Sequence, residues 1–297
     1  KIYQTLAGEH FPLRFNCYIG MDYLDQVLDG RIPRVSGPWL RIEGIKIFHG
    51  NSLSGKTCWL YEPYDTVNPR TGLRDYYGIP PARSQASLDS LVLKIHHAGL
   101  QIACHSNGDR EIEMVLTAYE RAMAADPRPD MRHRIEHCSI TNQEILDRIL
   151  RDSVVPVFHS YANELGDQLR VYGAKRLAMI MPTRTATDMG IVWAMHSDYP
   201  ISRFEPMKRL DGAVNRKAPS GVVIGDNQRI TVEEAMKAFC VGGAYTTHEE
   251  GVKGRVVTGE YADLVVLDQD PTAISPARLP EVGVVMTIVG GKVVYSR

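Results

Sequence analysis

The chain has 297 residues, of which 44% are hydrophobic and 23% charged, and this composition indicates a folded globular protein rather than a disordered one. Its 34 basic and 35 acidic residues give a formal net charge of -1, which argues against a nucleic-acid partner, and no apolar run approaches the roughly 18 residues that a membrane span needs. Five widely spaced cysteines without a C-x-x-C pair argue against a disulfide framework, so we expect a cytoplasmic protein.

Six short apolar segments rich in β-branched residues are predicted strands. Each is followed by a turn signal and then by a polar or helical segment, as in the βα units of a parallel sheet or barrel. The six segments are 11–20, 39–50, 100–103, 132–135, 154–158 and 191–195. The sequence therefore predicts an α/β fold.

Helical patterns lie between these strands and have recognisable starts. Segments 87–99 and 108–125 each place apolar residues on one face. Thr141 with Glu144, and Thr231 with Glu234, fit the capping box, in which each side chain binds a free backbone N–H group of the first turn. Asn107 and Asp109, at the start of segment 108–125, are expected to cap that helix.

The pattern of residues changes near the end of the sequence, which suggests two domains. Residues 1–245 are predicted to form the α/β part, and residues 246–297 to form a small all-β part, because short β runs there alternate with Gly and Pro. Segment 51–85 is rich in Gly, Pro and Tyr and follows a strand directly. A long loop at that position would line the mouth of a barrel.

Polar residues at the strand ends are the main functional signal. Four of the ten histidines follow a predicted strand closely: His105, His137, His159 and His196. Asp198 comes two residues after the last of them, and Lys46 lies inside the apolar run GIKIF. One histidine after a strand is more often a structural residue, but the carboxyl ends of parallel strands meet at one mouth. We therefore expect these residues to share a site, in which His159 and His196 either contact substrate or serve packing.

These residue types suit a metal centre. Imidazole nitrogens and carboxylate oxygens are the ligands of a catalytic zinc or similar divalent ion that keeps one position open for water. A buried lysine can join such a set only if its charge is removed. Carbamylation by carbon dioxide converts the amine to a carboxylate-like ligand, and burial favours the neutral amine that this reaction needs.

The motifs around these residues resemble those of a known family. They are IKIFHGNSLSG around Lys46, ACHSNGDR around His105, RIEHCSI around His137 and HSDYP around Asp198, followed by AVNR, GEYADLVVLDQDP and TIVGGKVVY. Together they resemble the amidohydrolase superfamily, most closely amidohydrolase family 3, the YtcJ-like branch that includes N-substituted formamide deformylases. The resemblance runs from about residue 12 to residue 295.

The resemblance implies a (β/α)8 TIM-type barrel with one or two divalent metal ions, most simply zinc, and a small β-sandwich. It implies a carboxylated Lys46, with His105, His137 and Asp198 as the other metal ligands. It also implies that Asp198 accepts a proton from the attacking water. The function expected on this basis is a metal-dependent amidohydrolase that uses metal-activated water to cleave carbon–nitrogen bonds, other than peptide bonds, in a small-molecule substrate.

The sequence departs from the family pattern on one point. The H-x-H pair of the first barrel strand is absent, and the adjacent pair His96-His97 lies in a helical pattern and cannot replace it. If Lys46 ends the fourth strand, the chain supplies strands three to eight, about six of eight. We therefore expect a missing N-terminal segment of the same barrel as a partner, whether this chain is a cleaved product or comes from a partial gene.

Three alternatives stay open. The chain could be a non-catalytic or ligand-binding barrel that lacks the first-strand ligands, or a lyase or isomerase on the same fold. The third alternative concerns assembly, since the chain could also form a homodimer.

Glu136 is expected to be a structural residue. Neighbours of an inward residue on a barrel strand should point outward, so Glu136, next to His137, is expected to face the helices.

Overall fold

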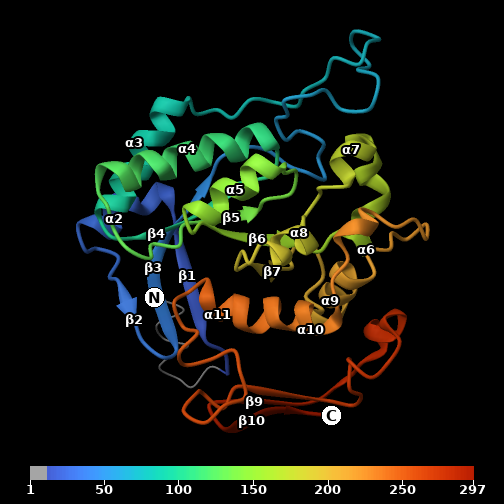
Figure 1. The fold of residues 1–297 in the computed structure, drawn as a ribbon. Coiled ribbons are helices and arrows are strands. Elements are labelled where there is room, and N and C mark those ends of the chain that lie inside the picture. The colour runs from blue at the N-terminus through green and yellow to red at the C-terminus, as the bar shows by residue number, and fades with distance from the viewer. Residues whose placement is uncertain (1–11) are drawn as a thin grey trace.

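The computed structural model describes residues 12–297, and its centre is a curled, parallel half-barrel of six strands (Figure 1). The strands pair in the order β1-β3-β4-β5-β6-β7, and the short β2 pairs antiparallel with β3. Their bounds are β1 Phe15–Gly20, β2 Val35–Ser36, β3 Leu40–Phe48, β4 Gln101–Ser106, β5 Arg134–His137, β6 Val155–His159 and β7 Ala194–His196. All six predicted strands are present, although Phe11, at the start of the first, lies outside the described residues.

Helices cover the outer face of this sheet and connect its strands. The α-helices are α2 Leu24–Leu28, α3 Gln85–His97, α4 Asp109–Ala125, α5 Gln143–Arg151, α6 Ala162–Leu165, α7 Gly173–Leu177, α8 Thr183–Asp188, α9 Pro206–Val214, α10 Val232–Lys237 and α11 Gly243–Tyr245. Shorter helical turns are η1 Met21–Tyr23, η2 Gly166–Tyr172, η3 Asp226–Gln228, the π-type η4 Ala238–Gly242 and η5 Pro276–Glu281. Between residues 12 and 297, no helix combines the length and apolar character needed to cross a bilayer.

Alternation along the strands decides which side chains reach the interior of the curl. Ile45 and Ile47 of β3 and Ile135 of β5 are fully buried in the layer between the sheet and the helices. Burying one such side chain stabilises the fold by about 1.5–3 kcal/mol, which fixes the register of each strand. The residues between them, such as Lys46 and Glu136, therefore face the concave side.

The helix starts confirm one predicted capping box and correct the other. Thr231 accepts from the backbone N–H of Glu234, whose side chain accepts from the backbone of Thr231 in return. At α5 the cap is Asn142 and not Thr141, because the Thr141 hydroxyl instead donates to the carbonyl of Met179 at 2.9 Å. A tertiary hydrogen bond has thus displaced the local one.

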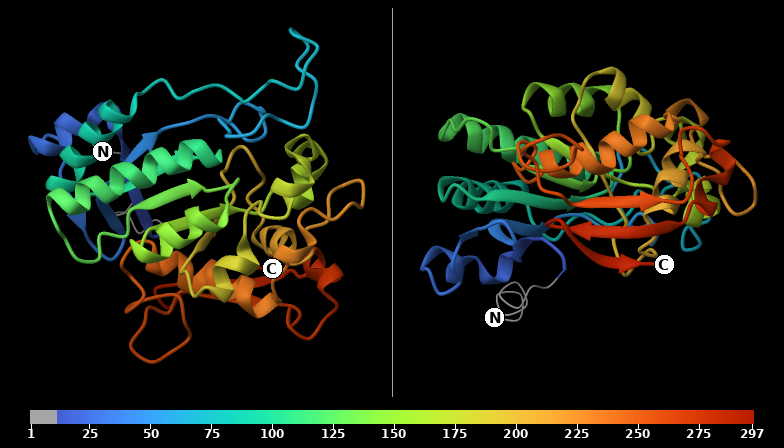
Figure 2. Two further views of the ribbon diagram at one scale, coloured as in Figure 1. Left: turned by 45° about the horizontal axis from the view of Figure 1, so that its top comes forward. Right: turned by 90° about the horizontal axis from the view of Figure 1, so that it is seen from below.

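The C-terminal region contains a three-stranded antiparallel sheet: β8 Leu264–Leu267, β9 Val284–Val289 and β10 Lys292–Ser296. It forms a separate layer, with α10 and α11 between it and the half-barrel (Figures 1 and 2). Arg14, just before β1, pairs with Asp263 at 2.6 Å and stacks over the rings of Trp39 and Tyr261. This contact ties the start of the described chain to the segment just before β8.

His96 of α3 and His133, just before β5, form a buried pair. His133 Nδ1 accepts the backbone N–H of Ile102 at 3.1 Å, so its proton must lie on Nε2, 2.9 Å from His96 Nδ1. His96 then donates from Nε2 to the carbonyl of Asp126 at 2.7 Å. Every ring nitrogen is satisfied when both rings are neutral. Burial and the neighbouring His96 lower the pKa of His133 to about 3.

This arrangement predicts loss of stability in acid. An unfolded His133 takes up a proton near pH 6.5, whereas the folded residue stays neutral down to about pH 3. The stabilisation is therefore complete above pH 6.5 and is lost below it, at about 1.4 kcal/mol per pH unit. The free energy of unfolding, measured with urea, should fall less between pH 7.5 and pH 5.5 in His133→Gln than in the exposed control His97→Gln. Equal decreases in the two variants would contradict this assignment.

Candidate active site

The carboxyl ends of β3 to β7 bring the predicted site residues together. Parallel pairing aligns Phe48 with His105, and His159 with His196. A cavity of about 180 Å³ opens there. Its lining residues are Tyr18, Lys46, Ala103, Arg134, Glu136, His137, His196 and Asp198. His105 lies beside this cavity, with its ring centroid 4.6 Å from that of His137.

Four imidazoles form a continuous row across the strand ends. The ring centroids of His137 and His196 are 4.8 Å apart, and those of His196 and His159 are 5.0 Å apart. Burial lowers the pKa of His105, of His137 and of His159, and it lowers that of His196 to about 4. The row is therefore neutral at pH 7, and neutral imidazole is the form that binds metal ions.

Lys46 enters the cavity from β3. Its Nζ lies 5.0 Å from the centroid of the Phe48 ring, and Ile45 and Ile47 on either side point into the helix layer. Burial lowers the pKa of Lys46, although the nearby Glu136 acts in the opposite direction. A lysine in this setting is closer to the neutral amine than an exposed one.

Glu136 faces the cavity, so the prediction that it points to the helices is wrong. Its carboxylate accepts two hydrogen bonds from Arg134, at 2.8 and 3.0 Å, and Arg134 also donates to the Tyr18 hydroxyl at 3.0 Å. Alternation from the buried Ile135 holds at Glu136 and ends at His137, whose φ of +73° ends the extended backbone and turns that ring to the same side. Burial acts to raise the pKa of Glu136, but Arg134 and Lys46 outweigh it and the pKa is lowered.

Tyr161 is a site residue that the sequence analysis missed. Its hydroxyl donates to Asp198 Oδ2 at 3.4 Å, lies 3.5 Å from His137 Nδ1, and its ring stacks on His159. Burial raises the pKa of Tyr161, so the hydroxyl remains a donor at neutral pH. Tyr161 follows β6 by two residues, as Asp198 follows β7. The same strand-end rule that identified the histidines could have found it.

The nitrogen atoms available in the row suit a cation. His105 Nε2 lies 3.1 Å from the carbonyl oxygen of Asn51 and 3.3 Å from Asn107 Nδ2. Because a carbonyl oxygen can only accept and its contact is the shorter one, we assign the proton to Nε2 and the lone pair to Nδ1. His159 Nδ1 and His196 Nε2 are buried without a hydrogen-bond partner among the described residues. Buried nitrogens in this state are expected to meet water or an ion. Within residues 12–297, however, no three His, Cys, Asp or Glu side chains form a ready-made ligand set.

His159 also has a structural role. Its Nε2 lies 2.7 Å from the carbonyl of Ser197 and 3.2 Å from the hydroxyl of Ser202. These contacts connect β6 to the loop after β7, which carries Asp198. The ring therefore helps to hold that loop in place, whether or not it also touches substrate.

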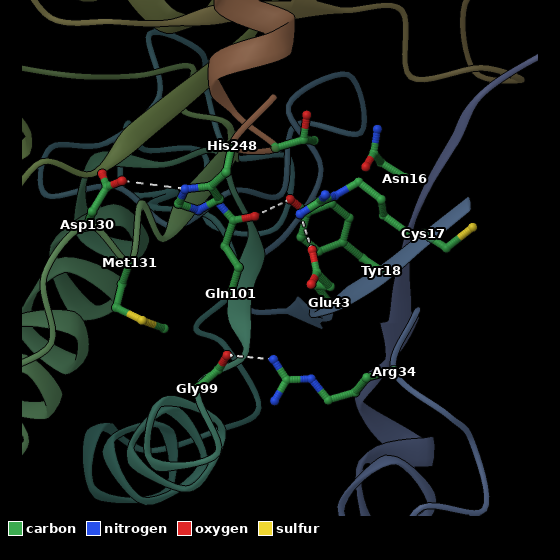
Figure 3. Close-up of a pocket in the computed structure, with 13 residues that line it drawn as sticks. Asn16, Cys17, Tyr18, Arg34, Glu43, Gly99, Gln101, Asp130, Met131 and His248 are labelled. Carbon is green, nitrogen blue, oxygen red and sulfur yellow. Dashed lines mark hydrogen bonds and ion pairs between the residues drawn. The ribbon is translucent and has the colours of Figure 1, made fainter. Parts of the chain in front are cut away.

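A second cavity, of about 270 Å³, lies at the opposite ends of the strands and contains none of the predicted site residues. Its charged groups find partners nearby: His248 is 3.6 Å from Asp130, and Arg34 donates to the carbonyl of Gly99 at 3.2 Å (Figure 3). Polar groups that satisfy one another in this way offer few free contacts to a ligand.

Comparison with known proteins places this geometry in a family. The chain is 27% identical to the amidohydrolase YtcJ of Bacillus subtilis (strain 168), over 100% of this chain and 55% of YtcJ. It is 26% identical to the N-substituted formamide deformylase of Arthrobacter pascens, over 72% of this chain and 40% of the deformylase. A metal-dependent hydrolase of Pyrococcus furiosus superposes with a TM-score of 0.75 at 25% identity, over 91% of this chain and 53% of that structure.

The chain thus spans about half the length of the proteins it matches. The six parallel strands and the superposition confirm the predicted α/β barrel fold, of which this chain forms a curled half-barrel. The model of the amidohydrolase family matches residues 2–295, nearly the whole chain. With the strand-end histidines and this match together, the chain belongs to the amidohydrolase family.

Proposed function

We propose that this chain carries most of the active site of a metal-dependent hydrolase that cleaves a carbon–nitrogen bond of the amide type in a small molecule. The observation that carries the proposal is the row of neutral imidazoles at the strand ends, beside Asp198 and the buried Lys46. The deformylase of Arthrobacter pascens, which acts on N-substituted formamides, supports the choice of bond.

Four residues would hold the metal: Lys46, His105, His137 and Asp198. Zinc, as one or two ions, is the first candidate because the donors are imidazole nitrogens and carboxylate oxygens. We propose that Lys46 is carbamylated, which would turn its buried amine into an oxygen donor. A divalent ion in this position would supply Lewis-acid polarisation of the scissile carbonyl and a more acidic water.

The residues of this chain then divide the remaining tasks. Asp198 takes the proton of the attacking water and passes it to the leaving nitrogen, which otherwise departs as a poor, strongly basic anion. Tyr161 holds the Asp198 carboxylate by its hydrogen bond to Oδ2. His196 faces the cavity beside Asp198 and, with His159, is proposed to contact the substrate.

An N-terminal segment of the same barrel is proposed to complete the site. Among the described residues, the outer edges of β1 and β7 have no paired strand. Unpaired edges of this kind are normally covered in native proteins. The five cysteines are free thiols, and a reducing cytoplasm is the compartment we propose.

Metal analysis and hydrolysis assays test the proposal. We expect the 297-residue chain to bind zinc weakly and to have little activity, and a version extended by an N-terminal segment with an H-x-H motif to hydrolyse members of a panel of N-formyl and N-acyl amines. A chelator should abolish that activity, and zinc with bicarbonate should restore it. Activity that survives chelation would refute the metal-dependent reaction. Zinc binding without any hydrolysis by the extended version would favour the ligand-binding alternative.

A further inference from the structure

Glu111, on the first turn of α4, is buried completely and joins two loops of the site. Its Oε1 accepts the backbone N–H groups of Asn51 at 2.9 Å and Trp59 at 2.7 Å, both in the segment after β3. Its Oε2 accepts those of Asn107 at 3.2 Å and Gly108 at 3.0 Å, after β4. Burial raises the pKa of Glu111 to about 7, while the four N–H groups favour the ionised form.

The surrounding backbone is shaped around this carboxylate. Gly50 has a φ of +104°, and a Cβ atom there would lie 2.3 Å from Glu111 Oε2. A Cβ atom on Gly108 would lie 2.2 Å from the carbonyl oxygen of Trp59. A glutamate that only caps its helix does not require such close approach of the backbone at Gly50 and Gly108. Glu234 occupies the same position of α10, and within the described part of the chain its carboxylate accepts hydrogen bonds only from its own cap residue and from Arg184.

The contact continues from Asn51 to the histidine row. The carbonyl oxygen of Asn51 accepts from His105 Nε2 at 3.1 Å and from Asn107 Nδ2 at 2.9 Å, and these two donor nitrogens lie 3.3 Å apart. The Ser139 hydroxyl donates to Asn107 Oδ1 at 2.8 Å and so holds that side chain. A carbonyl oxygen can only accept, so it fixes the His105 proton on Nε2 and leaves the lone pair on Nδ1. The expected capping role of Asn107 is therefore wrong, because its side chain serves this contact.

We propose that Glu111 is a positioning residue: it fixes the loop of Asn51 so that the Asn51 carbonyl selects the Nε2-protonated form of His105. The proposal rests on the proposed function only where His105 is taken as a metal ligand. Outer partners of metal-bound histidines typically change metal affinity 10- to 100-fold when removed.

Glu111→Gln tests this link with little change in size. The glutamine has one acceptor oxygen, so it can serve one pair of N–H groups and must turn its NH2 group toward the other. Glu234→Gln is the matched control, because it alters the same helix position in a capping box far from the histidines. Both variants, and the unmodified chain, are labelled with ¹⁵N-histidine, and His105→Asn identifies the His105 resonances.

We expect the ¹⁵N shifts to show the Nε2–H form of His105 in the unmodified chain and in Glu234→Gln, and a mixture of both forms in Glu111→Gln. We also expect Glu111→Gln to bind zinc 10- to 100-fold more weakly than the control. If Glu111→Gln does not fold, Glu111→Asp retains the buried charge but is too short to reach both loops, and the same changes are expected in it.

The two proposals fail in different ways. An unchanged His105 proton form, with zinc affinity within twofold of the control, would overturn the role of Glu111. A redistribution of the proton in Glu111→Gln, in a chain that binds no zinc even when extended at its N-terminus, would support the role of Glu111 and refute the metal-dependent reaction instead.

Discussion

Asp198→Asn is expected to lower the turnover of the extended enzyme by about 10²–10⁴-fold, the range typical of a lost general acid–base group. Asparagine has nearly the same shape and can still accept the Tyr161 hydrogen bond, but it cannot take a proton from water. Zinc should remain partly bound because Lys46, His105 and His137 are unchanged. Single-turnover kinetics and metal content are measured on the same samples.

Asp188→Asn is the control for this variant, because Asp188 ends α8 and its side chain is exposed. Its turnover should equal that of the unmodified enzyme. If Asp198→Asn retains more than a tenth of the turnover, Asp198 is not the residue that moves the proton.

Removal of a proposed nitrogen ligand should have an even broader effect. His137→Ala and His105→Ala are each expected to lose both zinc and hydrolysis, since water replaces a neutral nitrogen ligand poorly. Alanine at residue 137 would also be strained, because φ there is +73°. His137→Asn removes the imidazole but tolerates that conformation, so it separates loss of the ligand from loss of the fold.

The measurements are zinc stoichiometry by mass spectrometry and rates on the amide panel, with His97→Ala as an exposed control. Unchanged zinc stoichiometry in both the His105 and His137 variants would show that the ligand assignment is wrong. A loss of zinc with a normal circular dichroism spectrum would support it.

The strands of the half-barrel could be predicted because burial leaves a strong pattern in the sequence. Ile45 and Ile47 flank Lys46 in an apolar run, and this alternation is what places Lys46 on the concave side. The cap of α5 could not be predicted with the same certainty. Thr141 and Asn142 are both good caps, and the choice between them was made by the carbonyl of Met179, which is distant in the sequence.

The site was predictable where the strand-end rule applied and not where it depended on backbone detail. The histidines, Lys46 and Asp198 all follow from their places on successive strands. The shared side of Glu136 and His137 does not, because the positive φ at His137 ends the alternation along β5 and turns its ring to the side that Glu136 occupies. Glu111 resembles an ordinary capping glutamate in the sequence, and its contacts with the loop after β3 depend on how a segment without periodicity folds.

The neutral state of the histidine row has a consequence for the cost of loading the site. Burial already keeps these rings unprotonated in the folded chain. The free energy needed to remove their protons is therefore part of the free energy of folding and not of metal binding. An incoming divalent ion would then displace few protons from these rings at pH 7, unlike an ion that binds exposed histidines near their ordinary pKa. These rings should therefore contribute less to the pH dependence of metal uptake than histidines on flexible peptides, which lose affinity as the medium becomes more acidic.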